Sequence, residues 1–150
     1  MNKEIFNQSH VFFDKTATTQ DEAFKVIATL ASELGYVADV DDYFVGLKER
    51  EEEATTGFKD QIAIPHSKNK TVLKPGMFLV KFAHSIPWNA LDGQPVRVAF
   101  ALTIPIEGSS EHLKLLSLIA RKLIDNEFRE SILKENNSQK LTEIINQISF

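Results

Sequence analysis

The sequence predicts an α/β fold in which helices flank both faces of a central β-sheet. Three observations lead to this prediction. Helical patterns occupy much of the first and last thirds of the chain, most of the short apolar strands lie between them, and the segment 96–104 is, apart from Arg97, apolar or small on both faces. Such a strand is typical of the middle of a sheet that is covered on both sides. At 150 residues, the chain has the length of one domain and can bury a sizeable core.

Four segments have the composition and length of strands. They are residues 11–13, 62–64, 77–83 and 96–104. The run at 62–64 is too short for a helix, and Pro65 ends it because proline has no N–H group to donate to a sheet. In the last segment, Val96, Val98, Phe100, Leu102 and Ile104 belong to one face, and Ala99, Ala101 and Thr103 belong to the other.

The first predicted helix has both a start signal and a stop signal. Thr19 stands three residues before Glu22, a spacing at which the two side chains can cap each other's backbone amides. Apolar residues then recur at helical spacing as far as Leu34. Gly35 follows, and glycine favours the left-handed conformation with which many helices end.

Helices are also expected at 39–53 and throughout the last third of the chain. The helix at 39–53 would bury Val40, Phe44 and Leu47 and leave its many carboxylates on a solvated face. In the last third, either Ser109 or Ser110 would cap a helix. The positions expected to be buried there are Leu113, Leu116, Ile119, Ala120 and Leu123, then Phe128, Ile132 and Leu133, and finally Leu141, Ile144, Ile145 and Ile148.

Composition and charge exclude several classes of protein. Hydrophobic residues make up 43% of the chain and charged residues 25%, which excludes a disordered or collagen-like chain. A net charge of −4 gives no broad attraction for nucleic acid or for an anionic membrane. Without cysteine there is no disulfide, cysteine zinc site or cysteine nucleophile. No apolar run is long enough to span a bilayer and the start lacks the core of a signal peptide, so a cytoplasmic protein is expected.

The common motifs of nucleotide-binding proteins and hydrolases are absent from the sequence. It contains no GxxxxGKS/T or GxGxxG loop, no HExxH zinc motif, no GxSxG nucleophile elbow and no calcium loop. An enzyme that binds ATP and magnesium through these devices is therefore not expected.

His66 is the histidine with the most informative context. It follows Ile62-Ala63-Ile64-Pro65, so a buried strand and a proline hold its backbone. An imidazole held in this way can present a ring nitrogen to a partner's reactive group, and rigid placement matters because small displacements of a reacting atom cost rate. From position alone, a histidine that merely starts a loop is an equal alternative. His10 and His84 lack such a context and are interpreted as ordinary core or surface residues.

Two further residues are candidates for a chemical role. His112 falls in the first turn of a predicted helix and points toward the rim of the core. The helix dipole there favours a neutral imidazole, which can donate one hydrogen bond to an anion. Arg50 is the only arginine in the first half of the chain and precedes the turn that leads to His66. The alternatives are a packed rim histidine and a salt-bridge partner for the neighbouring glutamates.

Four segments resemble one known family. The string Thr56-Gly57-Phe58-Lys59-Asp60-Gln61-Ile62-Ala63-Ile64-Pro65-His66 resembles the active-site signature of the fructose/mannitol-type enzyme IIA domain of the bacterial phosphoenolpyruvate-dependent sugar phosphotransferase system. Leu47-Lys48-Glu49-Arg50-Glu51 is similar to that family's Arg-Glu segment, and Glu111-His112-Leu113-Lys114-Leu115-Leu116 to its second-histidine helix. Trp88, Asp92-Gly93 and Val96 match its W…DG…V stretch. The four segments follow the family's order and span nearly the whole chain.

The resemblance implies a fold and a function. It implies a mixed central sheet with helices on both faces, in a single domain over residues 1–150. It also implies that His66 accepts a phosphoryl group from the phosphocarrier HPr and passes it to a cysteine of enzyme IIB, assisted by Arg50 and His112. Enzyme IIC in the membrane would be an indirect partner, and no metal or cofactor is required. Since this chain has neither cysteine nor a membrane span, IIB and IIC would be separate polypeptides in a fructose-type uptake system.

The sequence also suggests residues for partner contact, departs from the family pattern at three positions, and leaves two alternative functions. Phe58 and Ile86 are candidates for an exposed contact with partners. The family usually has glycine near Lys59 and near Gln61, and often a small residue other than serine at Ser67, so this sequence departs from the pattern there. One alternative is a nitrogen-type regulatory enzyme IIA, although the W…DG…HLKLL set is closer to the fructose type. The other is a metal-dependent hydrolase built on the histidines 66 and 112, which lack a carboxylate at ligand spacing.

Overall fold

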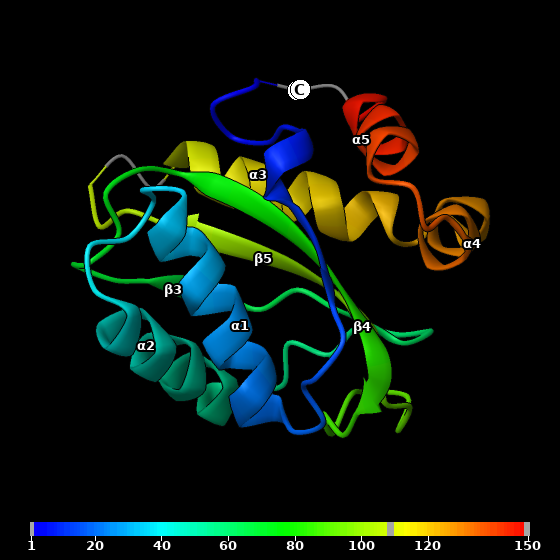
Figure 1. Cartoon of the computed structure of the whole chain (residues 1–150), viewed down its shortest axis with the longest axis horizontal. Coiled ribbons are helices and arrows are strands. Elements are labelled where there is room, and N and C mark those ends of the chain that lie inside the picture. The colour runs from blue at the N-terminus through cyan, green and yellow to red at the C-terminus, as the bar shows by residue number, and fades with distance from the viewer. Residues whose placement is uncertain (1, 108–109, 149–150) are drawn as a thin grey trace.

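In the computed structural model, a mixed β-sheet runs through the middle of the molecule (Figure 1). The structure describes residues 2–107 and 110–148. Their strands are β1 (Val11–Asp14), β2 (Ile62–Ala63), β3 (His66–Lys68), β4 (Gly76–Ile86) and β5 (Val96–Ile104). The strand order is β1-β4-β5-β2, and β3 also pairs with β5. The β4–β5 pair is antiparallel, whereas β1 runs parallel to β4 and both β2 and β3 run parallel to β5, which confirms the predicted mixed sheet.

All four predicted strands are present, with differences at their ends. The strand predicted at 77–83 extends over Gly76–Ile86, and β5 has the predicted bounds and the predicted central position. The strand predicted at 62–64 stops at Ala63, because the Ile64 amide donates to the Thr56 carbonyl at 2.9 Å instead of to β5. Pairing with β5 resumes at His66, and this second short strand, β3, was not predicted.

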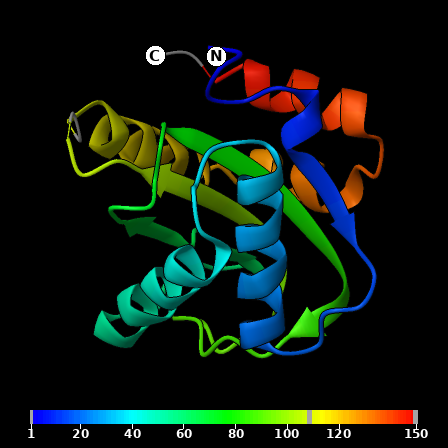
Figure 2. The same cartoon turned by 60° about the vertical axis from the view of Figure 1, so that its left-hand side comes forward.

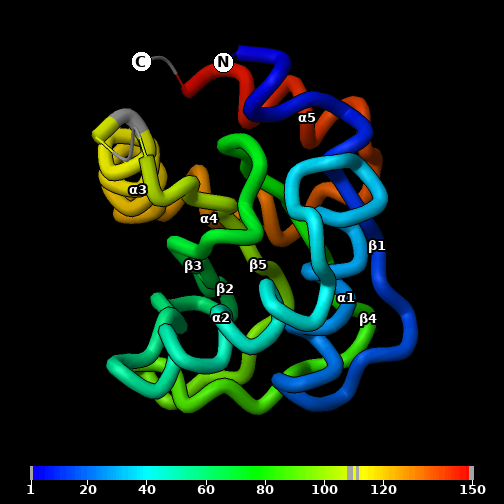
Figure 3. Tube along the Cα trace, turned by 90° about the vertical axis from the view of Figure 1, so that its left-hand side faces the viewer, coloured from blue at the N-terminus to red at the C-terminus, as the bar shows by residue number. Residues whose placement is uncertain are grey.

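The helices form two layers, one on each side of the sheet. They are α1 (Gln20–Glu33), α2 (Val40–Glu53), α3 (Ser110–Lys122), α4 (Asn126–Lys134) and α5 (Ser138–Asn146), and a short 3₁₀ helix, Gln8–His10, precedes β1. Figures 2 and 3 show α1 and α2 on one face of the sheet and α3, α4 and α5 on the other. The predicted α/β fold with helices on both faces is confirmed.

The predicted signals at the ends of α1 act as capping groups. Thr19 Oγ1 accepts the N–H of Glu22 at 3.1 Å. The Glu22 carboxylate accepts the amide of Thr18 at 2.9 Å, one residue before the expected partner. Gly35 follows the helix with a φ of +86°, a conformation that glycine adopts without strain. The next helix, α2, begins after Asp39 as expected, because that side chain caps its first turn.

The alternation of side chains along β4 and β5 divides the core into two clusters, one under each helical layer. Phe78, Val80, Ala99 and Ala101 belong to the cluster under α1 and α2, and Met77, Leu79, Val98, Phe100 and Leu102 belong to the cluster under α3–α5. The predicted faces of β5 are therefore confirmed, with one exception. Val96 packs under α1 and α2, next to the shift in pairing between Lys81 and Ile86.

The buried stripe of α3 differs from the prediction at its start. Ile119 and Leu123 are buried as predicted, and Leu116 and Ala120 are partly buried, whereas Leu113 is 59% exposed and Leu115 is only 3% exposed. The fully buried row is therefore His112, Leu115, Ile119 and Leu123, at helical spacing. Of the two candidate caps, Ser110 is the first residue of α3, and Ser109 lies outside the described residues. Over the ranges 2–107 and 110–148, no helix has both the length and the apolar character needed to cross a membrane.

Candidate active site

The His66 imidazole lies at a break between two short strands on the same side of β5. Ile64 and Pro65 separate β2 from β3, and both strands run parallel to β5. His66 does not start a loop, because it opens β3 opposite Leu102 of the central strand. The carbonyl of Pro65 accepts the Leu102 amide at 3.0 Å, which fixes the backbone directly before the histidine. The imidazole is half-buried, and the backbone that carries it is paired with β5.

Both ring nitrogens of His66 have defined surroundings. Nδ1 lies 2.8 Å from the carbonyl oxygen of Ile64. A carbonyl oxygen can only accept a hydrogen bond, so Nδ1 carries the proton of the neutral ring. Nε2 therefore presents a lone pair, and Nε of Arg50 donates to it at 3.2 Å. The geometry leaves Nε2 as the nucleophilic nitrogen of the imidazole.

Arg50 reaches His66 from the last turn of α2. Its Nη1 donates to the carbonyl oxygen of Ala54 at 2.9 Å, so the guanidinium is held by its own helix end while Nε contacts the histidine. Among the described residues, no carboxylate lies within ion-pair distance of Arg50. The alternative in which Arg50 is a salt-bridge partner of its neighbouring glutamates is therefore wrong for this structure.

The surroundings of His66 favour its neutral form. Burial lowers the pKa of the His66 imidazole below its ordinary value of 6.5, and the Arg50 cation lowers this pKa further. The hydrogen bond to Ile64 and the carboxylates of Glu51 and Glu53 oppose this shift. A neutral imidazole is the form in which Nε2 can act as a nucleophile.

Glu51 ties the end of α2 to the segment that carries His66. Its carboxylate accepts the hydroxyl of Thr55 at 3.1 Å, and both the amide (3.0 Å) and the hydroxyl (2.5 Å) of Thr56. Nε1 of Trp88 donates to the same Thr56 hydroxyl at 3.3 Å. Sequence reasoning missed this role, because Glu51 belongs to the acidic run assigned to a solvated face. The signal available was the Thr55-Thr56 pair directly after the helix, since hydroxyls there can bond to a carboxylate one turn back.

A glycine lets α2 approach β3 closely. A Cβ atom at Gly46 would collide with the hydroxyl of Ser67 and lie 2.5 Å from Nδ2 of Asn69. Ser67 directly follows the histidine, and Gly46 lies one turn before Arg50 on the same helix. The contact between Gly46 and β3 therefore contributes to the placement of Arg50 beside His66.

His112 lines a cavity beyond the ends of β3 and β5. As predicted, it points inward, and it is only 6% exposed at the start of α3. It lines a cavity of about 680 Å³ together with Lys70, Val72, Leu73, Pro75, Pro105, Ile106 and Glu107. These residues follow the carboxyl ends of β3 and β5, whereas neither His66 nor Arg50 lines the cavity. The structure thus joins His66 to Arg50 directly and places His112 beyond the end of β3.

The residues predicted to contact partners differ in exposure. Ile86 is fully buried under α1 and α2, so the prediction that it forms an exposed contact is wrong. Phe58 is partly buried against the opposite cluster. Leu73 and Ile106, which line the cavity of His112, are 61% and 45% exposed and are the better candidates.

The remaining histidines have no place at this site. His84 is exposed on β4, and His10 is buried among aromatic rings near the N-terminus. In the part of the chain that the structure describes, no group of three or more His, Asp or Glu side chains could hold a metal ion.

The chain is similar to proteins of one family along nearly all of its length. The family model described as "Phosphoenolpyruvate-dependent sugar phosphotransferase system, EIIA 2" matches residues 4–148. A "PTS system fructose-specific EIIA component" from Haloferax volcanii is 31% identical over 138 residues, which are 92% of this chain and 90% of the relative. The crystal structure of the nitrogen regulatory protein IIA-Ntr from Neisseria meningitidis has a TM-score of 0.86 at 27% identity, covering 95% of this chain and 97% of that one. In fold, the chain also resembles an Escherichia coli IIAMtl structure in complex with phosphorylated IIBMtl, with a TM-score of 0.79, 17% identity, and coverage of 95% and 97%.

Proposed function

The chain belongs to the EIIA 2 family of the phosphoenolpyruvate-dependent sugar phosphotransferase system, and from this premise we propose that it is a phosphocarrier that accepts a phosphoryl group from HPr on His66. The protein then passes the group to a cysteine of a separate enzyme IIB, with membrane enzyme IIC as an indirect partner. Residues 1–150 act as one domain in the cytoplasm. The observation that carries the proposal is the Nε2 lone pair of His66, fixed by the Ile64 carbonyl on the other ring nitrogen and met by Arg50.

The fixed tautomer allows transfer without a general base. Nε2 has no proton to lose, so its lone pair can form a bond to phosphorus while the bond between phosphorus and the donor breaks. The Nδ1 proton stays on Nδ1 throughout, hydrogen-bonded to the Ile64 carbonyl oxygen. When a thiolate of enzyme IIB attacks, the bond between phosphorus and Nε2 breaks and the neutral imidazole returns with its lone pair. The ring therefore begins and ends the cycle in the same protonation state.

Arg50 supplies positive charge where the phosphoryl group arrives. In the unphosphorylated protein, Nε of Arg50 donates a hydrogen bond to the lone pair of Nε2. The guanidinium therefore has to turn toward the phosphoryl oxygens as the new bond forms. A guanidinium beside those oxygens stabilises the charge that spreads over them in the transition state. The scheme uses only donors of the protein, and no metal or cofactor takes part in it.

His112 is the third proposed residue of the site. Near the start of α3, a neutral imidazole can donate one N–H group to a phosphoryl oxygen. The exposed side chains of Leu73 and Ile106 beside its cavity, together with the exposed Lys70 at the rim, suit brief contact with a partner protein. HPr and enzyme IIB would use this face in turn.

Phosphorylation by purified components tests the proposal. The protein is incubated with phosphoenolpyruvate, enzyme I and HPr, and its intact mass is measured without acid treatment. We expect one added phosphoryl group in the wild type and in the control His84→Ala, and none in His66→Ala. We expect nitrogen-15 NMR of the product to show the phosphoryl group on Nε2. Wild-type protein that gains no phosphoryl group, or gains it on another residue, would contradict the proposal.

A fructose-type uptake system is the proposed setting, and a nitrogen-type regulatory role is the alternative. Similarity to the fructose-specific relative supports the first, and the match to the nitrogen regulatory structure favours the second. Phosphorylated protein mixed with membranes that contain fructose enzymes IIB and IIC distinguishes them. Formation of fructose phosphate, lost in His66→Ala, supports uptake, whereas failure to transfer to any sugar-specific IIB supports the regulatory role.

A further inference from the structure

The turn that precedes β2 contains two non-glycine residues in the left-handed region. Residues 59–61 connect Phe58 to Ile62, whose carbonyl accepts the Phe58 amide at 2.8 Å. Within this 59–61 turn, Asp60 has a φ of +51° and Gln61 a φ of +71°. Residues with a side chain adopt such angles at a cost that glycine does not have, so contacts elsewhere must hold the turn.

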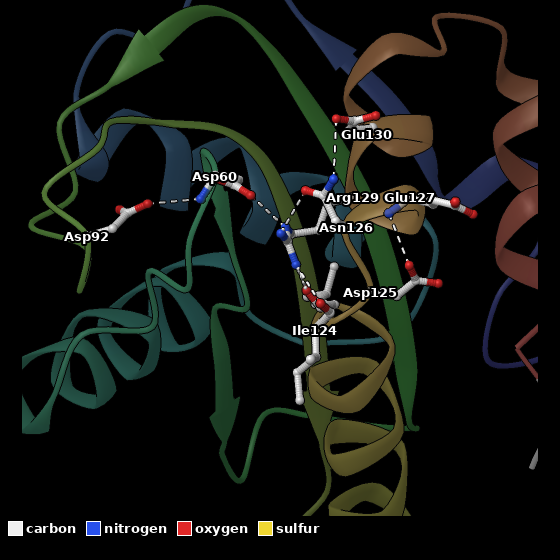
Figure 4. A network of polar contacts seen from close by, with 9 residues as sticks. Asp60, Asp92, Ile124, Asp125, Asn126, Glu127, Arg129 and Glu130 are labelled. Carbon is white, nitrogen blue, oxygen red and sulfur yellow. Dashed lines mark hydrogen bonds and ion pairs between the residues drawn. The ribbon is translucent and has the colours of Figure 1, made fainter.

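Arg129 supplies one of these contacts from the other helical layer (Figure 4). Its side chain on α4 is 5% exposed, and Nε lies 2.7 Å from Oδ2 of Asp60. Nη1 donates to the carbonyl oxygens of Leu123 (2.6 Å) and Ile124 (2.9 Å), and Nη2 donates to Oδ1 of Asn126 (3.0 Å). The guanidinium is thus fixed by the end of α3 and the start of α4, and it presents Nε to Asp60 in one orientation.

The turn is held from a second side by its backbone. Oδ2 of Asp92 accepts the Asp60 amide at 3.0 Å, as Figure 4 also shows, while Oδ1 accepts the amide of Gln94. The carbonyl of Gln61 accepts the amides of Arg97 at 2.8 Å and Val98 at 3.1 Å. The side chain of Asp60 therefore faces Arg129, and the backbone of the turn is joined to β5 and the loop before it.

A short hairpin connects this turn to the histidine. Gly57 bridges Ala63, and the amide of Ile64 donates to the Thr56 carbonyl at 2.9 Å. The carbonyl of the same Ile64 accepts the Nδ1 proton of His66. A change in the shape of the 59–61 turn would move the two arms of this hairpin against each other, and with them the carbonyl that fixes the tautomer of His66.

We propose that the Arg129–Asp60 ion pair positions His66 for phosphorylation, by holding the left-handed turn whose hairpin carries the Ile64 carbonyl. The inference rests on the proposed function, because it assigns positioning residues to that reaction. Arg129 and Asp60 touch neither the imidazole nor the phosphoryl group, so they act through the tautomer of His66 and the placement of its Nε2.

Two substitutions at Asp60 separate backbone conformation from charge. Asp60→Ala and Asp60→Gly both remove the ion pair and leave the other hydrogen bonds of Arg129 in place, but only glycine adopts a positive φ without strain. We expect Asp60→Ala to lower the fraction of His66 with its proton on Nδ1, seen by nitrogen-15 NMR, and to slow phosphorylation by about tenfold, since small displacements of reacting atoms cost rate. We expect Asp60→Gly to stay within about twofold of the wild type in both measurements.

Arg129→Lys tests the same proposal from the other partner. A lysine keeps the charge but cannot bond to Asp60 and to the carbonyls of Leu123 and Ile124 in the fixed geometry of a guanidinium. We expect the same losses as in Asp60→Ala, and recovery when Asp60→Gly is added. Asn126→Ala is the matched control, because it removes one hydrogen bond of Arg129 and leaves the ion pair; it should lower stability without changing the tautomer.

Several results would overturn the proposal. Equal behaviour of Asp60→Ala and Asp60→Gly would do so, and so would a slower Asp60→Ala with an unchanged tautomer of His66. The tautomer is measured without any phosphoryl donor, so this test is separate from the proposed function. If the wild type accepts no phosphoryl group, the proposed function fails, whereas an altered tautomer in Asp60→Ala still supports the positioning of His66 by the ion pair.

Discussion

Two imidazoles of this protein, the half-buried His66 and the buried His10, are held in the same way on one side of the ring and differently on the other. Each has Nδ1 at 2.8 Å from a backbone carbonyl oxygen, that of Ile64 for His66 and that of Met77 for His10. A carbonyl oxygen can only accept a hydrogen bond, so each Nδ1 donates to the carbonyl that it faces, and the backbone of Ile5 also interacts with the His10 ring. In each case burial is the main cause of a pKa below the ordinary value of 6.5.

The difference lies at Nε2. In His10 this atom is 3.4 Å from Nδ2 of Asn7, and the ring stacks on Phe78 with their centroids 4.7 Å apart. His10 is 1% exposed, so no substrate can reach it. In His66 the same atom meets a guanidinium at a half-buried position. A fixed tautomer and a lowered pKa are thus not sufficient to identify a nucleophile, and the group that faces the lone pair distinguishes the two histidines.

Alanine at each position should separate the two roles most strongly. His66→Ala is expected to abolish phosphorylation while its unfolding free energy stays within about 1 kcal/mol of the wild type. His10→Ala is expected to keep phosphorylation at 25 °C and to lower the unfolding free energy by about 3 kcal/mol, because it removes a buried ring and leaves the Met77 carbonyl without its donor. Denaturant titration and the phosphorylation assay measure both. Phosphorylation of His66→Ala, or a His10→Ala variant as stable as the wild type, would contradict the different roles assigned to the two histidines.

Replacing Arg50 should leave Nε2 of His66 without a guanidinium partner, as is the case for Nε2 of His10. We expect Arg50→Ala to slow phosphorylation by about a hundredfold, the cost typical of losing one charge-stabilising donor. The phosphorylation rate of Arg50→Lys should lie between those of the wild type and Arg50→Ala, since lysine keeps the charge but lacks the several N–H donors of a guanidinium. Because the cation is lost, the pKa of the His66 imidazole should rise in Arg50→Ala, as measured by NMR titration.

Lys48→Ala is the matched control for Arg50→Ala, because it removes the same charge from α2. Lys48 forms an exposed ion pair with Asp21 at 3.2 Å and contacts neither His66 nor Ala54. Its replacement should leave the pKa of His66 and the phosphorylation rate unchanged. If the two variants behave alike, the net charge of the helix matters and the contact between Arg50 and His66 does not.

The sequence predicted the parts of this molecule whose signals are local. The bounds of β5 follow from an apolar run with two different faces, and Thr19 and Asp39 cap the helices where expected. Only the start of the α3 stripe was misplaced, because residues 113 and 115 are both leucine and packing alone decides which of them is buried. For the same reason β3 was missed: three residues after a proline carry no pattern of their own, and their pairing depends on β5.

For the candidate site, too, the sequence predicted only what local signals indicate. The contact between Arg50 and His66 could be anticipated, since the family resemblance places both residues near one turn. Arg129 could not be, because its partner Asp60 lies 69 residues away and neither residue has a distinctive neighbourhood in the sequence. Glu51 was assigned to solvent because its neighbours are acidic, and only the folded structure distinguishes it from them.

A methyl group at position 46 should weaken the contact between Arg50 and Nε2 of His66 without removing either side chain. Gly46→Ala places a methyl group against the side chains of Ser67 and Asn69, and we expect an accompanying displacement of Arg50 to slow phosphorylation by about tenfold. The overpacking should also cost about 1 to 3 kcal/mol of unfolding free energy. Ser67→Gly, which removes one of the two colliding groups, should restore part of the rate. Val45→Ala on the exposed side of the helix is the control, and an unchanged rate in Gly46→Ala would show that Arg50 does not depend on this approach.

The smallest expected effect is the contribution of the two histidines to stability at mildly acidic pH. Because the pKa of each is lower in the folded protein than the ordinary 6.5, protonation favours the unfolded chain. Their contribution is therefore complete above pH 6.5 and is lost as the pH falls below it, at no more than about 1.4 kcal/mol per pH unit for each histidine. Denaturant titrations between pH 7.5 and about 5.5 measure this loss. That pH range lies above the ordinary carboxyl pKa values of 4.5 for Glu and 3.8 for Asp. His10→Phe and His66→Ala should each reduce the slope, and their combination should reduce it most; a slope unchanged in both variants would mean that neither imidazole is kept neutral by the fold.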